Sequence, residues 1–219
     1  MKKFNCLIAI ALILFTSSCK QTTYYTNAVP VEDYAAYVLS APSETIVVDN
    51  DDNDVTSVFA SWYGKGKNQN QILRYLATNQ YSFKTTHESN DLPVTRIFKT
   101  KRITQIFVDT YTFNINNQSI ERMFVSSISV SVIYNIHTYE ILDFHPNAMT
   151  SVPVSESPEK TDLEIYTNGM SIQSKVSKDG SYMTSYSTAH IFVAAKPNDT
   201  SRSSGQLLDT IWHSIVITP

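Results

Sequence analysis

A long stretch of strictly alternating apolar and polar side chains most limits how this chain can fold. The apolar members occupy every second position: Ile128, Val130, Val132, Tyr134 and Ile136. Successive side chains of a β-strand point to opposite faces, so this period of two predicts a sheet with one buried and one wet face. The residues expected on the wet face are polar: Ser129, Ser131, Asn135 and His137.

Neighbouring segments show the same pattern. Tyr111, Phe113 and Ile115 alternate with polar residues and are followed by Asn116-Asn117, a pair typical of a tight hairpin turn. We therefore expect long antiparallel strands over residues 94–99, 103–115 and 119–144.

The N-terminal part has helical rather than strand periodicity. Residues 31–39 predict a short helix, and a short strand over 45–48 precedes the acidic run 49–54. That run is expected to cap a second helix, because Asp and Asn accept hydrogen bonds from the free N–H groups of a first turn. The stripe of this helix, which ends at Gly64, is Val55, Val58, Phe59 and Trp62. A third helix is expected over 68–79, with an apolar side made of Ile72, Leu73, Tyr75 and Leu76.

The C-terminal part predicts a β-meander. Pro146, Pro153 and Pro158 favour a connection over 146–160. Asn168-Gly169 and Asp179-Gly180 predict hairpin turns that separate strands over 163–167, 170–177 and 181–195. Leu207, Leu208, Ile211 and Ile215 favour a final helix, with an edge strand over 211–218 as the alternative.

These elements predict a β-dominated α+β fold. We expect N-terminal helices packed on an antiparallel sheet in an α+β unit over 31–145. The 146–160 connection then leads to the C-terminal meander and final segment over 161–219, within the same domain.

The first nineteen residues have the layout of an export signal. Lys2 and Lys3 precede an apolar stretch over 4–15, too short to cross a bilayer, and small residues lead to Cys19. The string Thr16-Ser17-Ser18-Cys19 resembles the lipobox of bacterial lipoproteins, although Thr16 stands where leucine is commonest. The resemblance implies a signal peptide over 1–18, acylation of Cys19, and a tether over 19–30. It also implies the outer membrane in a double-membraned cell, because Lys20 and Gln21 provide no aspartate retention signal.

Cysteine content and charge exclude several classes of site. The only other cysteine, Cys6, is lost with the signal, so the mature chain has neither a disulfide nor a thiolate metal site. The whole chain has 17 basic and 20 acidic side chains; removal of Lys2 and Lys3 leaves 15 basic ones and a formal net charge of −5. Scattered basic residues argue against nucleic acid, and five glycines argue against a phosphate-binding loop.

Two residue groups have features of a metal or catalytic site. Asp49, Asp51 and Asn53 have the spacing of the first ligands of a calcium loop, but Asp54 replaces its glycine. Asp143 and His145 share strand parity and could contact one ion, whereas His137 on the same strand would lie about 26 Å from His145. No zinc motif and no serine-hydrolase elbow occurs. We therefore expect no metal, no cofactor and no catalytic residue.

The functional hypothesis follows from the anchor. We expect a membrane-anchored, non-enzymatic binding or scaffolding component of an envelope assembly, whose partner is an envelope protein or glycan. Thirteen Tyr and two Trp provide aromatic area for either partner. Two alternatives stay open: a hydrolase acting on envelope polysaccharide or peptide, and a secreted pore-forming protein.

The anchor is testable by mass. Intact-mass analysis of the protein purified from its native host is expected to show a chain that begins at Cys19 and carries a diacylglycerol on its sulfur. A soluble product with a free thiol, or one that still begins at Met1, would contradict the lipoprotein assignment.

Overall fold

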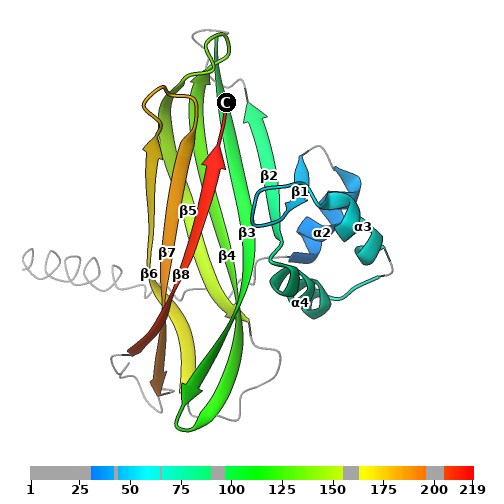
Figure 1. The fold of residues 1–219 in the computed structure, drawn as a ribbon, viewed down its shortest axis with the longest axis vertical. Coiled ribbons are helices and arrows are strands. Elements are labelled where there is room, and N and C mark those ends of the chain that lie inside the picture. Colours follow the sequence, from blue (N-terminus) through cyan, green and yellow to red (C-terminus); the bar gives the residue numbers. More distant parts are fainter. Residues whose placement is uncertain (1–30, 42–43, 65, 90–96, 155–162, 196–204) are drawn as a thin grey trace, which may run out of the picture.

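The described part of the computed structural model consists of two antiparallel sheets and a layer of three helices (Figure 1). The structure describes residues 31–41, 44–64, 66–89, 97–154, 163–195 and 205–219. The predicted β-dominated α+β class, with N-terminal helices packed on an antiparallel sheet, is confirmed. The signal peptide, Cys19 and the tether lie outside the described residues, as does the end of the expected connection, 155–160. No helix among the described residues is long and apolar enough to cross a membrane.

Sheet A has five strands in the order β1-β2-β3-β4-β5. The strands are β1 (Thr45–Val48), β2 (Ser82–Ser89), β3 (Phe98–Ile115), β4 (Gln118–Asn135) and β5 (Ile141–Val154). The long β3–β4 hairpin closes at Asn116 and Asn117, with φ of 51° and 61°. Positive φ at both positions is what a two-residue hairpin turn requires, and this confirms the predicted turn.

The central hairpin is covered on both faces. On one face, Ile106, Val108 and Val125 pack with the helices. On the other, Ile103, Ile128, Val130 and Val132 pack against sheet B. The expected wet face is therefore partly buried: Ser131 is only 5% exposed and accepts a hydrogen bond from Asn147 Nδ2 at 2.6 Å.

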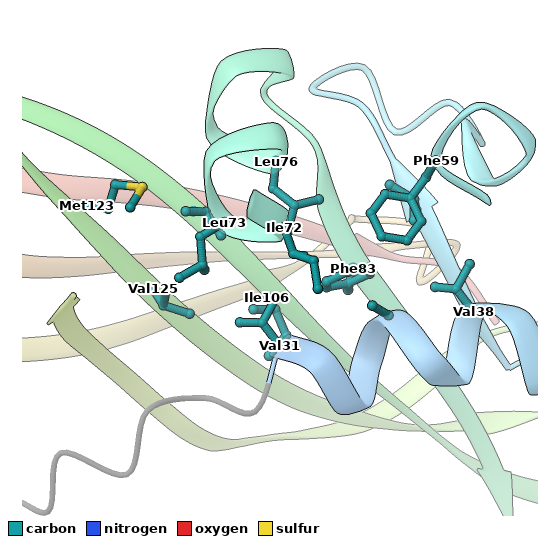
Figure 2. Packing of buried hydrophobic residues seen from close by; sticks show 13 residues of the cluster. Val31, Val38, Phe59, Ile72, Leu73, Leu76, Phe83, Ile106, Met123 and Val125 are labelled. Atoms are coloured by element: carbon teal, nitrogen blue, oxygen red, sulfur yellow. The ribbon is translucent and has the colours of Figure 1, made fainter. Parts of the chain in front are cut away.

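The helix layer consists of α2 (Val31–Ser40), α3 (Thr56–Tyr63) and α4 (Gln69–Asn79). A capping box between Asn68 and Gln71 begins α4, and both of its hydrogen bonds are present. Figure 2 shows that α4 directs Ile72, Leu73 and Leu76 toward the sheet, as the stripe predicted.

The stripe predicted for α3 is right only in part. Phe59 is fully buried and Trp62 packs partly against the same cluster, but Val58 is 51% exposed. The acidic run precedes α3 but does not provide its N-cap, which is Val55 and makes no side-chain capping hydrogen bond. Asp54 Oδ1, one residue earlier, accepts a hydrogen bond from the Thr56 amide at 2.8 Å.

Sheet B is a meander in the order β6-β7-β8. Its strands are β6 (Leu163–Val176), β7 (Met183–Ala195) and β8 (Gln206–Ile217). The turn predicted at Asp179-Gly180 joins β6 to β7. The Asp179 carboxylate accepts hydrogen bonds from Ser177 and Ser181, which hold its pKa down at about 2.

Two sequence predictions for sheet B are wrong. The final segment is strand β8 and not a helix, because Ile211, Ile215 and Ile217 point inward with a period of two. Asn168-Gly169 lies inside β6, where Gly169 (φ 64°) belongs to a bulge that shifts the pairing with β7. The positive φ of Gly169 therefore belongs to a bulge and not to a hairpin turn.

Three predictions for sheet A also need correction. The Pro-rich connection is wrong for Pro146 and Pro153, which lie in β5; an edge strand tolerates prolines because one side of its backbone has no partner. The strand expected over 119–144 is interrupted after Asn135 by a turn that contains His137. Strand β2 was not predicted, because Phe83 is its only large apolar residue.

Three hydrogen bonds among the described residues join the two sheets. The Thr167 hydroxyl of β6 donates to the carbonyl of Ser151 in β5. The amide of Ile141 donates to the carbonyl of Gly180 at 2.9 Å, and Lys101 Nζ donates to the carbonyl of Thr218 at 2.9 Å. Hydrogen bonds therefore join the sheets along β5, at β6 and at the β6–β7 turn, whereas the hydrogen bond from β3 is to the C-terminal end of β8.

Truncation of the helix-layer core tests this packing. Phe59→Ala is expected to lower the free energy of unfolding by about 3–5 kcal/mol, because a buried ring is replaced by a cavity. Urea titration measures the change. The adjacent Val58→Ala should cost less than about 0.5 kcal/mol, because Val58 is exposed. Equal losses for the two variants would contradict the described packing.

Candidate functional site

A groove of about 760 Å³ lies on the open side of the sandwich. Residues 212–216 of β8 and 107–111 of β3 line it, together with the acidic loop 49–52 and the end of α4. Its volume falls within the range of roughly 300–1,000 Å³ typical of ligand sites.

The lining residues show that the groove follows strand edges. Five consecutive residues of each strand contribute, although neighbouring side chains point to opposite faces. A space that contacts consecutive residues must run along the backbone. β2 begins at Ser82, and its first residue paired with β3 is Phe83, beside Ile106, so the 107–111 segment of β3 continues beyond its paired β2 partner.

A buried acid–base pair lies at the groove. His213 Nε2 is 2.9 Å from Asp109 Oδ2, and the His213 side chain is only 8% exposed. The Phe107 ring stacks on the imidazole with 4.0 Å between centroids. Neither paired atom makes a hydrogen bond with other described residues. The pair therefore joins β3 to β8 across the base of the groove.

Tyr111 lies two residues farther along β3. Burial, together with the smaller effect of the negative charges of Asp109 and Asp209, raises its pKa to about 12. The phenol therefore stays protonated and is a hydrogen-bond donor at neutral pH.

The acidic wall is a self-contained loop. Asp49 Oδ1 accepts hydrogen bonds from the amides of Asp51 and Asn53, both at 2.9 Å. Bonds from the Asn53 side chain and amide keep the pKa of Asp49 below its ordinary value. Asn50 Nδ2 donates to Gln80 Oε1 at 2.9 Å, which attaches the loop to α4. The Asp49 carboxylate thus stabilises the loop and is already occupied by its own N–H groups.

Charge in the groove is mainly negative. Among the lining residues are Asp49, Asp51, Asp52 and Asp109, and no Lys or Arg. Lys84 contacts Asp52, with Nζ 2.7 Å from Oδ1, and compensates one of these charges. The surface that remains favours a cationic ligand.

Exposed apolar side chains border the groove on the outer face of sheet B. Trp212 is 68% exposed, and Val216 lies four residues along the same face of β8. Tyr186 of β7 pairs with Ser214, between them, and is 53% exposed. Large aromatic side chains exposed on a flat sheet are typical of a contact surface.

Of the two groups singled out from the sequence, the calcium-loop-like one contributes Asp49 and Asp51 to the groove, whereas the histidine group lies elsewhere. His145 and Asp143 approach to 3.4 Å on β5, but both are well exposed, and His137 lies in the β4–β5 turn. None of them lines the groove. Cys19 lies outside the described residues.

Sequence reasoning missed Asp109, His213 and Trp212. The available signal was the parity of β8, because Ile211, His213, Ile215 and Ile217 share one face and leave Trp212 on the other. A helix prediction for this segment assumes a period of 3.6 residues and therefore does not show this alternation.

The acidic and histidine side chains of the described residues can be compared with the needs of a metal site and of a hydrolase. In the part of the chain that the structure describes, no three His, Cys, Asp or Glu side chains cluster as a metal site would require. His213 and Asp109 could form the base and orienting acid of a hydrolase, but no described Ser, Thr or Cys makes a hydrogen bond with the imidazole.

No protein-family model, no curated protein and no solved structure matches this chain. The groove is therefore the principal observation that bears on function.

The raised pKa of Tyr111 predicts a loss of stability at high pH. The unfolded phenol titrates near its model value of 10.0 and the folded one near 12, so this contribution is complete below the first value and is lost as pH rises through the second. Tyr111→Phe removes the ionisable hydroxyl. Urea midpoints at about pH 8 and about pH 11 should therefore fall less in the variant than in the wild type. An equal fall in both proteins would contradict the assignment.

Proposed function

We propose that this chain is a lipid-anchored, non-enzymatic binding protein of the bacterial cell envelope, which holds its partner in the groove between β3 and β8. The observation that carries the proposal is the groove itself: two strand edges and exposed Trp212 around a negatively charged space. The lipobox-like Thr16-Ser17-Ser18-Cys19 supports the anchor.

The energetics favour Trp212 as the main contact. A large, rigid aromatic side chain gains much contact area for little loss of rotamer freedom, and Trp is among the residues enriched at binding hot spots. Trp212 leaves more of its surface in water than any other large apolar side chain among the described residues. Covering it is the most favourable single contact that the groove offers.

A hydrolase is the second candidate, and one observation favours it. The buried His213–Asp109 pair has the composition of a general base with its orienting acid. If it acts in hydrolysis, His213→Ala abolishes cleavage of envelope polymers.

Photocrosslinking in the native host tests the binding proposal. A photoreactive amino acid in place of Val216 is expected to give a discrete adduct, because Val216 lines the groove. Trp212→Ala should reduce the yield of that adduct at least about tenfold, as expected for loss of a hot-spot side chain.

Tyr37 provides the matched control position. It is exposed on α2 and does not line the groove, so a probe there should give no such adduct. Absence of an adduct from position 216, or the same adduct from position 37, would contradict binding in the groove.

The anchor has its own control. Cys19→Ala is expected to release the chain from the membrane fraction into the soluble fraction. Membrane retention of this variant would contradict lipid attachment at Cys19.

A further inference from the structure

The free edge of β8 lacks the features that normally protect an edge strand. Native proteins block exposed edges with lysine, proline, bulges or very short strands. Residues 210–217 contain no Lys, Arg or Pro, and the one register shift with β7 lies near the other end, between Ile191 and Phe192. Among the described strands, β7 alone pairs with β8.

The other edges in the described part of the chain are protected. β5 contains Pro146 and Pro153 and two register shifts, and Thr167 of β6 lies against it. β1 is only four residues long. The contrast indicates that another strand covers β8 in the working protein.

The negative charge of the groove distinguishes between two strands that could pair with β8: the β8 of a second copy and a strand with basic side chains. Pairing of two β8 edges in a symmetric dimer would bring two acidic grooves together, because the same patch faces itself across the two-fold axis. Like charges in one enclosed space are unfavourable. A strand with basic side chains meets the opposite sign in the lining aspartates that Lys84 does not compensate.

We propose that the groove binds an extended polypeptide segment bearing lysine or arginine, which adds to sheet B as a fourth strand beside residues 212–216 of β8. This inference rests on the proposed binding function and specifies its ligand. In strand addition the backbone hydrogen bonds supply affinity, and alternate side chains supply specificity. The basic side chains face the aspartates, and the side chains between them contact Trp212 and Val216 on the outer face.

The dimensions suit such a segment. Five residues of β8 extend over about 16 Å at about 3.3 Å per residue, which matches a strand of ordinary length.

Three synthetic peptides of about eight residues test the proposal against the full mature chain in detergent. The first alternates lysine and valine, the second alternates glutamate and valine, and the third is the lysine peptide with every backbone nitrogen methylated. Calorimetry is expected to show at least tenfold weaker binding of the second and third peptides. Methylation removes the strand donors and keeps the charge, so it separates strand pairing from simple electrostatic attraction.

Hydrogen exchange and charge variants complete the test. The lysine peptide should slow amide exchange in residues 212–216 and leave β6 unchanged. Asp51→Asn with Asp52→Asn should weaken its binding at least about fivefold, because two lining charges are removed. Glu32→Gln with Asp33→Asn removes two charges from the first turn of α2, away from the groove, and should leave binding unchanged.

Three outcomes would overturn the inference: equal binding of the methylated peptide, no protection of residues 212–216, or a concentration-dependent dimer that protects them without peptide. The photocrosslinking experiment separates this failure from that of the proposed function. If the peptides fail while the adduct from position 216 still depends on Trp212, the ligand class is wrong and the binding function stands. If the adduct is also absent, both are wrong.

Discussion

Burial of both faces of the β3–β4 hairpin is the constraint on which the rest of the structure depends. Each of these strands is 18 residues long and alternates between two cores. Ile106 and Val108 lie under the helices, whereas Ile103 and Phe113 lie under sheet B. A two-stranded ribbon exposed to water is marginally stable, so the helices on one side and the meander on the other are what stabilise so long a hairpin.

Unequal strand lengths then create the site. β2 has eight residues and β3 has 18. β3 therefore extends beyond β2 in the segment where Phe107, Asp109 and Tyr111 face sheet B. β8 crosses this region as the last strand of its own sheet. The groove is thus a consequence of topology. The edges of β3 and β8 lie beside each other, but the two strands belong to different sheets. The His213–Asp109 contact links the two sheets where no backbone ladder does.

The sequence predicted those elements whose local signals agree with their tertiary surroundings. In α4 the capping residues and the apolar stripe indicate the same helix, and Asn116-Asn117 is a turn in both sequence and structure. Strand β2 escaped prediction because its polar side chains gain stability only from pairing with β1 and β3. β8 was misread because Ile211 and Ile215 satisfy a period of 3.6 as well as a period of two. The site could not be assembled beforehand, because Asp109 and His213 come together only once that strand is placed on β3.

The proposed anchor and the proposed groove reinforce each other energetically. A short strand pair with a few charge contacts gives modest affinity, because ordering an extended segment costs conformational entropy. Attachment to the same membrane as the partner raises the effective concentration of one for the other, so modest affinity is sufficient for stable occupancy. The same reasoning accounts for the unprotected edge of β8. A freely diffusing protein with such an edge risks pairing with other chains, whereas an anchored chain whose groove is occupied keeps that edge covered.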